Sequence, residues 1–246
     1  MLFDPGVVET LSSALPLWLF ALVVILSQIG SIYVIAPGVV LAYLFGDRER
    51  TATWLGIIIA AYGLFVAVKP LTDVPRPDVE PPFSSAELPA LLVPLFEAST
   101  DFETGSFPSG HTLASTVFWG LVMIDLRVST FRRRFLTGVT VVSVVCFARV
   151  ALATHYVGDV VGGVVLGLAL LGFLLPVRRY HPNPATALLA LAALPASAGI
   201  LLGRPIDGAI LLVTIVSAYV GNRRIDSTWQ PDLQTIRKRI GLARHR

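Results

Sequence analysis

Long apolar runs recur along almost the whole chain, and they constrain its fold more than any other feature. A bilayer core is crossed by a helix of roughly 20 predominantly apolar residues. Only 14% of the 246 residues are charged, whereas a soluble domain usually carries about 25%. Because repeated runs of this length are what a bilayer demands, the sequence predicts an all-α fold, a polytopic transmembrane helical bundle.

Eight apolar segments are expected to span the membrane. The first two are separated only by Gln-Ile-Gly-Ser at 28–31, and they are split there because residues 11–46 are too long for one ordinary span. Joining them would leave seven spans. The chain is predicted to comprise a six-span core at 1–180, two additional transmembrane helices at 181–222 and a basic cytoplasmic tail at 223–246. The expected segments are 11–28, 31–46, 52–69, 109–126, 134–152, 155–176, 184–203 and 206–221.

The distribution of arginine and lysine predicts how the bundle lies in the cell membrane. The loops at 46–51, 127–133 and 177–183 and the C-terminal tail are rich in arginine, whereas the 70–108 loop is mainly acidic. By the positive-inside rule, both termini are expected to be cytoplasmic and the 70–108 loop to lie outside. The seven-span alternative would move only the N-terminus. Because the first residues lack the basic region of a cleavable signal, the first span is expected to be retained.

The middle of the long loop, residues 85–98, is apolar but too short to span a membrane. It is expected either to lie at the interface over a lipid-facing site or to pack as a surface loop. The single cysteine, Cys146, excludes an internal disulfide and a multi-thiolate metal site. The net charge of +3 comes without a basic block interleaved with aromatic residues, so no nucleic-acid partner is expected.

Three groups of polar residues stand at the ends of apolar segments, all expected at the outer face. Ionisable residues in or beside membrane spans are costly and therefore mark candidate functional sites. Lys69 and Arg76 follow the third segment, and Ser109, Gly110 and His111 begin the fourth. A helix that starts in this way offers free backbone N–H groups and a positive dipole end to an anion.

The third group joins the fifth and sixth segments and contains Arg149, His155 and Asp159. His155 and Asp159 are four residues apart, so they would share one face of a helix. A carboxylate can hold one imidazole nitrogen and leave the other free. A structural salt bridge between Arg149 and Asp159 is the alternative interpretation.

Together the three groups supply what phosphoryl transfer needs. Cationic side chains neutralise phosphoryl oxygens, and arginine often does so through paired hydrogen bonds. Backbone and hydroxyl donors at Ser109 and Gly110 add directed hydrogen bonds. Two histidines permit covalent catalysis, one as nucleophile and one as general acid. These motifs contain no carboxylate cluster of the metal-site type, so neither a metal nor a cofactor is expected.

The three groups resemble the signature of the type 2 phosphatidic acid phosphatase superfamily, which also includes vanadium haloperoxidases and bacterial acid phosphatases. That signature is a lysine and an Arg-Pro separated by six residues, then Pro-Ser-Gly-His, then Ser-Arg, five residues, His, three residues and Asp. The matching residues are Lys69 with Arg76-Pro77, Pro108-Ser109-Gly110-His111, and Arg149 with His155 and Asp159. The motifs cover about residues 69–159, and the helix pattern covers about 11–176.

The resemblance implies a role for each matching residue. His155 would attack phosphorus and become a phosphohistidine, Asp159 would orient it, and His111 would protonate the leaving oxygen. The phosphate would be held by Lys69, Arg76, Ser109, Gly110 and Arg149. One position departs from the signature, because Ala148 stands where the family has serine. That change removes a donor for phosphate binding or for placing the arginine.

The resemblance further implies an integral membrane lipid phosphatase whose partners are the bilayer and a lipid phosphate. The candidate substrates are phosphatidate, phosphatidylglycerol phosphate and polyprenyl diphosphate, the last favoured by the expected external face. One alternative is a phosphotransferase that passes the phosphoryl group to an alcohol. Another is a non-catalytic lipid-binding protein or transporter, and a haloperoxidase is disfavoured because the comparable membrane-embedded members are phosphatases. The sequence specifies neither the lipid nor the oligomeric state.

Overall fold

The computed structural model describes residues 2–100, 104–127 and 129–228. Within these residues every regular element is helical and none is a strand, which confirms the predicted fold class. Short 3₁₀ turns, η1 (Gln28–Gly30) and η2 (Ser85–Glu87), precede α3 and α5. The α-helices are α1 (Pro5–Ser13), α2 (Leu17–Ser27), α3 (Ile32–Phe45), α4 (Arg48–Thr72), α5 (Val93–Thr100), α6 (Gly110–Asp125), α7 (Phe131–Ala151), α8 (Val157–Tyr180), α9 (Pro184–Leu201) and α10 (Pro205–Thr228).

Five of the described helices are long and apolar enough to cross a membrane, namely α4, α7, α8, α9 and α10. A sixth candidate span exists only if α1 and the following segment Leu17–Gly30 are taken together, and the two are bent by 118° relative to each other. Large apolar side chains also face outwards; in α10, Ile206 is 75% exposed and Val213 is 65% exposed. Soluble proteins seldom expose a large apolar surface to water, whereas a membrane protein exposes such a surface to lipid. The fold is therefore a helical membrane bundle.

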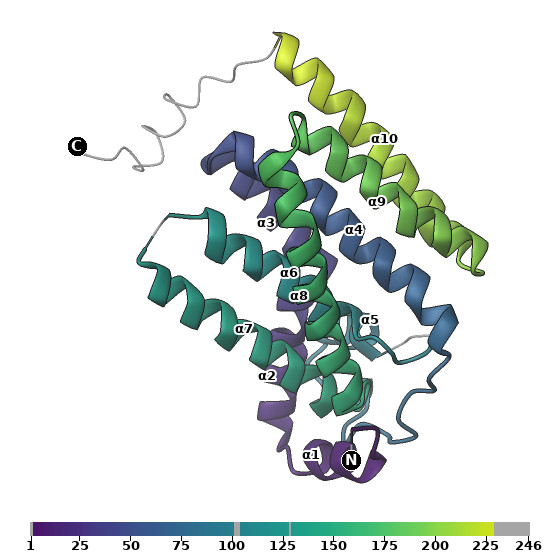
Figure 1. Ribbon diagram of the computed structural model, residues 1–246. Coiled ribbons are helices and arrows are strands. Elements are labelled where there is room, and N and C mark those ends of the chain that lie inside the picture. The colour runs from purple at the N-terminus through teal and green to yellow at the C-terminus, as the bar shows by residue number, and fades with distance from the viewer. Residues whose placement is uncertain (1, 101–103, 128, 229–246) are drawn as a thin grey trace.

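The two ends of the bundle differ in their connections (Figure 1). One end, which we call the site end, carries α1, residues 73–100 and 104–109, and the 152–156 turn. The opposite end, which we call the far end, carries the short connections from α3 to α4, from α6 to α7 and from α8 to α9.

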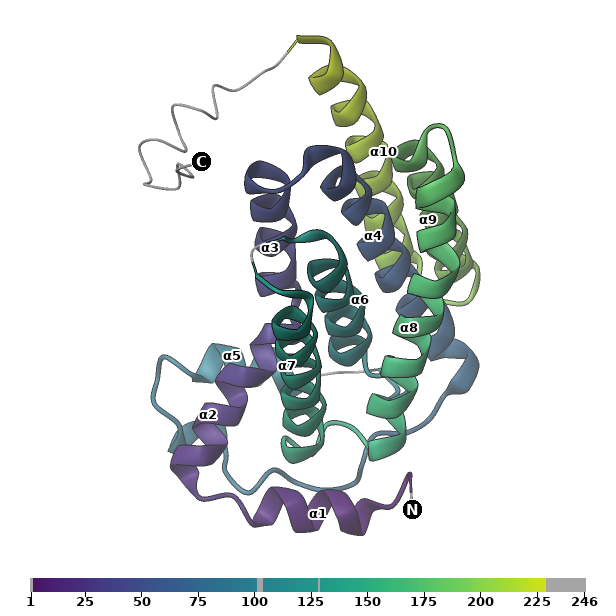
Figure 2. The same cartoon turned by 60° about the vertical axis from the view of Figure 1, so that its left-hand side comes forward.

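The prediction that residues 11–46 form two antiparallel spans is wrong. Helices α2 and α3 continue in the same direction across η1, so they form one interrupted crossing (Figures 1 and 2). The break is buried, with Gln28 only 8% exposed and Ser31 only 5% exposed. A turn at the membrane surface would leave such polar groups to water, but here the Gln28 amide donates to the carbonyl of Leu95 at 3.0 Å. The continuous path of α2 and α3 corresponds to the interpretation in which residues 11–46 are joined.

The two described ends of the chain lie at opposite ends of the bundle, whereas eight spans would place them at the same end. Helix α1 lies at the site end, below α7, whereas the last described turns of α10 lie at the far end (Figure 2). The reason is that α2 and α3 form one crossing and not two, which places the N-terminal end of the chain at the opposite side from that expected with eight spans. The predicted basic tail begins within α10, and its residues 229–246 lie outside the described residues.

Helix α4 forms a hub for the other helices. Helix α9 packs along α4, and α10 packs on both of them, so the C-terminal helix pair is attached to the core through α4. Close approach depends on small residues, as expected for helices in a membrane. A Cβ added at Gly199 of α9 would lie 2.5 Å from Cγ1 of Val66 in α4.

A buried ion pair joins three helices at the far end. Arg178 of α8 donates to both carboxylate oxygens of Asp125 in α6, at 2.5 and 3.1 Å. Nε1 of Trp54 in α4 donates to Asp125 Oδ2 at 2.7 Å. Because the Asp125 side chain is 0% exposed, these donors replace the water that its charge would otherwise need.

The 85–98 segment folds as η2 and the start of α5, and it packs against α2. Leu88 and Phe96 are buried in one apolar cluster with Phe20 and Val23 of α2. Leu91 points outwards and is 84% exposed. Most of the segment therefore packs as a surface loop, as one of the two alternatives expected. This packing places α5 beside the break between α2 and α3.

Candidate active site

The residues predicted from the three motifs all stand at the site end of the bundle. Lys69 lies near the end of α4, Arg76 in the following segment, and Ser109 and Gly110 at the start of α6. His111 lies in the first turn of α6. The remaining three come from the end of α7, the 152–156 turn and the start of α8: Arg149, His155 and Asp159.

His155 and Asp159 form a buried pair. Nδ1 of His155 lies 3.3 Å from Oδ2 of Asp159, and the side chains are 3% and 0% exposed. The same Oδ2 accepts the backbone N–H of Tyr156 at 2.8 Å. Because the carboxylate occupies the Nδ1 side of the ring, it leaves Nε2 without this partner.

The turn that carries His155 has an unusual backbone. Ala153 has φ of 56°, in the left-handed region that residues other than glycine seldom adopt. Its N–H donates to the carbonyl of Val150 at 3.0 Å, and the Thr154 hydroxyl donates to the carbonyl of Arg149 at 2.9 Å. These bonds fold the chain back on the end of α7, so that His155 meets Asp159 at the start of α8.

Arg76 is bound to the backbone of two neighbouring segments. Its Nε donates to the carbonyl of Thr104 at 2.9 Å, and its Nη1 donates to the carbonyl of Thr154 at 2.7 Å. Burial lowers the pKa of Arg76 to about 10, an effect that Asp159 opposes. The guanidinium therefore stays charged at neutral pH, next to the turn that carries His155.

Lys69 and Gly110 meet around one aromatic ring. The ammonium of Lys69 lies 5.0 Å from the centre of the Phe65 ring and donates to the carbonyl of Gly105. A Cβ at Gly110 would lie 2.7 Å from the same ring. Glycine at this position therefore allows the start of α6 to approach α4, which brings Lys69 close to the helix N-terminus.

Ser109 caps α6 and connects it to α8. Its hydroxyl accepts the N–H of Thr112 at 3.5 Å, and its backbone N–H donates to the carbonyl of Asp159 at 3.0 Å. Gly163 permits this contact, because a Cβ there would lie 2.8 Å from the carbonyl oxygen of Ser109. The two helices that carry His111 and Asp159 are thus held together where they begin.

Arg149 is fully buried, and it contacts elements outside the predicted motifs. Its Nη1 donates to the hydroxyl of Ser27 and its Nη2 donates to the carbonyl of Ser99, both at 2.9 Å. The neighbouring Ala148, which replaces the family serine, is 1% exposed and packs in an apolar cluster with Phe20 of α2. These two acceptors belong to α2 and α5.

The electrostatic environment of His155 shows that the three motifs converge. Burial lowers the pKa of its imidazole well below the ordinary value. Nearby positive charges lower the pKa further, in the order Arg149, Arg76, Lys69 and His111. An imidazole in this setting stays neutral at neutral pH and keeps one unprotonated ring nitrogen.

One important residue lies outside the predicted set. The hydroxyl of Ser106 is within 3.3 Å of Asp159 Oδ1 and within 3.0 Å of the carbonyl of Pro75, and Ser106 is 0% exposed. Ser106 therefore supports the carboxylate that orients His155. The sequence indicates Ser106 only by its position three residues before Ser109. A serine at such a position looks like an ordinary helix-capping residue, so its role could not be predicted.

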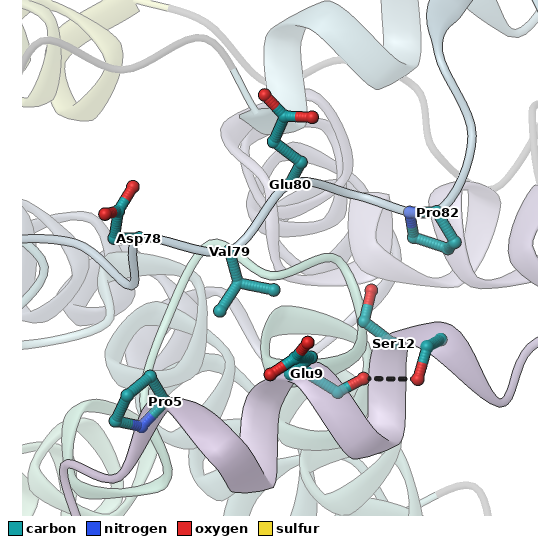
Figure 3. A pocket seen from close by; sticks show the side chains of 8 residues that line it. Pro5, Glu9, Ser12, Asp78, Val79, Glu80 and Pro82 are labelled. Carbon is teal, nitrogen blue, oxygen red and sulfur yellow. Dashed lines mark hydrogen bonds between the residues drawn. The ribbon is translucent and has the colours of Figure 1, made fainter.

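A separate hollow of about 450 Å³ lies between α1 and the 78–82 segment (Figure 3). Its walls contain none of the predicted site residues; they are Pro5, Glu9, Ser12, Ser13, Asp78, Val79, Glu80 and Pro82. In the described residues, no group of three or more His, Cys, Asp or Glu side chains is arranged to hold a metal ion.

Fold and site together define a helical membrane protein with a histidine–carboxylate pair among cations. The sequence model of the PAP2 superfamily matches residues 50–183, which is more than half of the chain. The chain therefore belongs to the PAP2 superfamily, which confirms the resemblance found in the three motifs. Membership of this superfamily supports phosphatase-type hydrolysis of a phosphoester. No curated protein and no solved structure matches the chain.

Proposed function

We propose that the chain is an integral membrane lipid phosphatase that hydrolyses a lipid phosphomonoester or diphosphate through a phosphohistidine on His155. One observation carries the proposal: His155, paired with Asp159, stands among cationic side chains at one end of a membrane bundle. A neutral imidazole with one nitrogen held by a carboxylate is a suitable nucleophile. Surrounding cations offset the charge of the transferring phosphoryl group.

The proposed reaction has two steps. First, Nε2 of His155 attacks phosphorus, the bond from phosphorus to the lipid oxygen breaks, and His111 gives its proton to that oxygen. Asp159 stabilises the positive charge that the ring acquires. In the second step water attacks the phosphohistidine, the phosphorus–nitrogen bond breaks, and His111 takes the proton from water. Inorganic phosphate leaves, and His155 returns to its neutral form.

The phosphate-binding set in this proposal needs no metal ion. Lys69, Arg76 and Arg149 supply positive charge, while Ser109 and the N–H of Gly110 supply directed donors. In many phosphoryl-transfer sites a bound cation supplies this neutralisation. Here the fixed cations of the chain take that part.

Exposed apolar side chains near the site support a lipid substrate. Trp18 of α2 is 69% exposed, Leu71 at the end of α4 is 66% exposed and Leu91 before α5 is 84% exposed. These residues belong to elements at the site end, where an acyl or prenyl chain would lie while its phosphate reaches His155. Polyprenyl diphosphate, phosphatidate and phosphatidylglycerol phosphate are the candidate substrates.

The test is phosphate release from each of these three lipids by purified protein in detergent, with a metal chelator present. We expect hydrolysis of at least one lipid, loss of activity in His155→Gln, and an acid-labile phosphoryl adduct on the wild-type protein. Activity that survives in His155→Gln, or that disappears with chelator, would contradict the proposal. Adding a short alcohol distinguishes the phosphotransferase alternative, since transfer to the alcohol would then exceed phosphate release.

A further inference from the structure

The buried guanidinium of Arg149 is held by two elements that are distant from it in sequence. Ser27 lies 122 positions before Arg149 and accepts Nη1 at 2.9 Å. Ser99 lies 50 positions before it and accepts Nη2 through its carbonyl, also at 2.9 Å. Hydrogen bonds from a charged donor are stronger than neutral ones and fix the plane of a guanidinium. The orientation of Arg149 is therefore set by α2 and α5.

Gln28 connects these two supports to each other. Its side-chain nitrogen donates to the Ser99 hydroxyl at 2.6 Å and to the Leu95 carbonyl at 3.0 Å. All the side chains of this group are buried: Ser27 and Ser99 are 0% exposed, and Gln28 is 8% exposed. In a buried polar network, each bond limits the freedom of the others. Gln28 therefore fixes α5 to the break in the first crossing.

The break lies directly against the helices of the candidate site. A Cβ at Gly30 would lie 2.9 Å from the carbonyl of His111 and 2.9 Å from Cγ1 of Val145. Only a residue without a side chain allows η1 to approach both α6 and α7 this closely. A shift of the break would therefore be transmitted to His111 as well as to Arg149.

Ser27 and Gln28 lie outside the part of the chain that the family model matches, which begins at residue 50. Within the matched part, Ala148 cannot supply the hydroxyl that the family serine would place beside Arg149. Ala148 instead lies in one buried apolar cluster with Val23 and Val24 of α2. The polar support of Arg149 on this side comes from the end of α2, one turn beyond those valines.

We propose that the interrupted first crossing acts as a positioning element for Arg149: Ser27 and Ser99 hold its guanidinium toward the phosphoryl group, and Gln28 fixes that arrangement. This inference rests on the proposed function, since it assigns a role within the same site. Ser27, Gln28 and Ser99 are positioning residues, because they act through Arg149 and not on the substrate.

The test is a double-mutant cycle between Ser27→Ala and Arg149→Lys. Lysine keeps the charge but lacks the planar fork that Ser27 orients. We expect Ser27→Ala to lower kcat roughly 10-fold, as for loss of a hydrogen bond to a charged group, and to weaken inhibition by inorganic phosphate. In the Arg149→Lys background the same substitution is expected to change kcat less than about twofold, since residues that act as a unit are not additive.

A second pair of variants keeps the proposal testable if Ser27→Ala folds poorly. Ser27→Thr retains the hydroxyl and should keep kcat within about threefold of wild type, whereas Gln28→Leu should lower it by about threefold or more. Ser31→Ala is the matched control, because this buried serine of the same break donates only to the Gln28 carbonyl among the described residues. Equal losses from Ser27→Ala in both backgrounds would overturn the proposal, as would a loss in Ser31→Ala as large as that in Ser27→Ala.

Failure of the proposed function gives a different result. If wild-type protein hydrolyses no lipid phosphate, calorimetric binding of inorganic phosphate replaces kcat as the readout. If Ser27→Ala weakens phosphate binding in the wild-type background but not in the Arg149→Lys background, Ser27 positions Arg149 for phosphate binding even though the proposed reaction does not occur. Unchanged phosphate binding in Ser27→Ala would overturn the positioning role itself.

Discussion

His155 is positioned by the turn around it as much as by its carboxylate partner. The left-handed residue Ala153 turns the chain back, and Thr154 then bonds to both arginine segments. Its carbonyl accepts Arg76, and its hydroxyl donates to the Arg149 carbonyl. One short turn therefore fixes His155 relative to two cations. Such fixed geometry is what electrostatic stabilisation of a transition state requires.

The depressed pKa of His155 predicts how activity depends on pH. An imidazole attacks only in its neutral form, which predominates above its pKa. Because burial lowers the pKa well below its ordinary value, lowering the pH from 7.5 to about 6.5 should leave the His155 contribution to kcat/KM intact. A pH profile of kcat/KM on the best lipid substrate measures this. An acid limb centred at or above the ordinary histidine pKa would contradict it, provided that the limb persists in His111→Gln and so does not belong to His111.

Ser106 predicts a loss of activity that no motif indicates. Replacing it with alanine removes the hydroxyl beside Asp159 Oδ1. The carboxylate then holds the imidazole less firmly, and kcat should fall roughly 10-fold. The measurement is kcat with the unfolding temperature recorded in parallel.

Ser115→Ala is the matched control for Ser106→Ala. Ser115 is also 0% exposed, but its hydroxyl has no hydrogen-bond partner in the described part of the chain. Its replacement should leave kcat within about twofold of wild type. If both variants lose activity equally, Ser106 has no specific link to Asp159.

The motif residues could be predicted from the sequence because their chemistry and spacing identify them. Lys69, His111 and Asp159 are costly in a membrane protein, so their presence points to a site. Serines such as Ser27 and Ser106 carry no such cost and occur throughout helix ends and turns. Their contribution depends on contacts between segments far apart in sequence, which spacing does not encode.

At the scale of elements, α1 supports the turn that carries His155. Val8 of α1 is 0% exposed and packs in one cluster with Val150, Ala153 and Tyr156. The backbone before α1 adds a bond, since the N–H of Gly158 donates to the carbonyl of Leu2 at 2.6 Å. A short amphipathic helix below the bundle thus stabilises the local geometry of the site.

Val8→Ala should therefore lower both stability and activity. Removing two buried methyl groups costs about 1–2 kcal/mol of unfolding free energy. Because the cavity opens under Ala153, kcat should fall as well, whereas Val7→Ala on the exposed face should change neither quantity. Thermal unfolding and kcat of both variants measure the effects. Loss of stability with unchanged kcat would contradict a role of α1 in placing His155.

The first crossing shows why hydropathy did not predict the topology. Gln-Ile-Gly-Ser at 28–31 is equally compatible with a surface hairpin and with an internal break. The structure selects the break because α5 satisfies Gln28 and because Gly30 fits against α6. Neither contact is encoded locally. The other expected segments correspond to α4 and α6 to α10, since each of these runs is bounded by polar loops.

At the scale of the whole molecule, the two ends of the bundle have opposite charge character. The far end carries arginines at the ends of its helices, including Arg48, Arg132 and Arg179, whereas residues 73–100 at the site end are mainly acidic. By the positive-inside rule, we expect the far end to be cytoplasmic and the site to face outwards.

Labelling with a membrane-impermeant maleimide tests this orientation. In a Cys146→Ala background, Glu80→Cys at the site end should react in intact cells, whereas Asn183→Cys at the far end should react only after permeabilisation. Both positions lie in exposed loops, so accessibility and not burial decides the result. Labelling of Asn183→Cys in intact cells with protection of Glu80→Cys would reverse the orientation.

The buried ion pair at the far end predicts that stability and catalysis can be separated. Asp125→Asn leaves the charge of Arg178 without its partner, and breaking a buried pair costs about 3–5 kcal/mol. The unfolding temperature in detergent should therefore fall, while kcat per folded molecule stays unchanged because His155 lies at the opposite end. Replacing the neighbouring exposed arginine, Arg179→Gln, should alter neither quantity.

A double replacement, Asp125→Leu with Arg178→Met, should recover much of the lost stability, since it removes both buried charges together. Loss of kcat in folded Asp125→Asn would mean that the far end is coupled to the site through α6 or α8, and the ends would then not act independently.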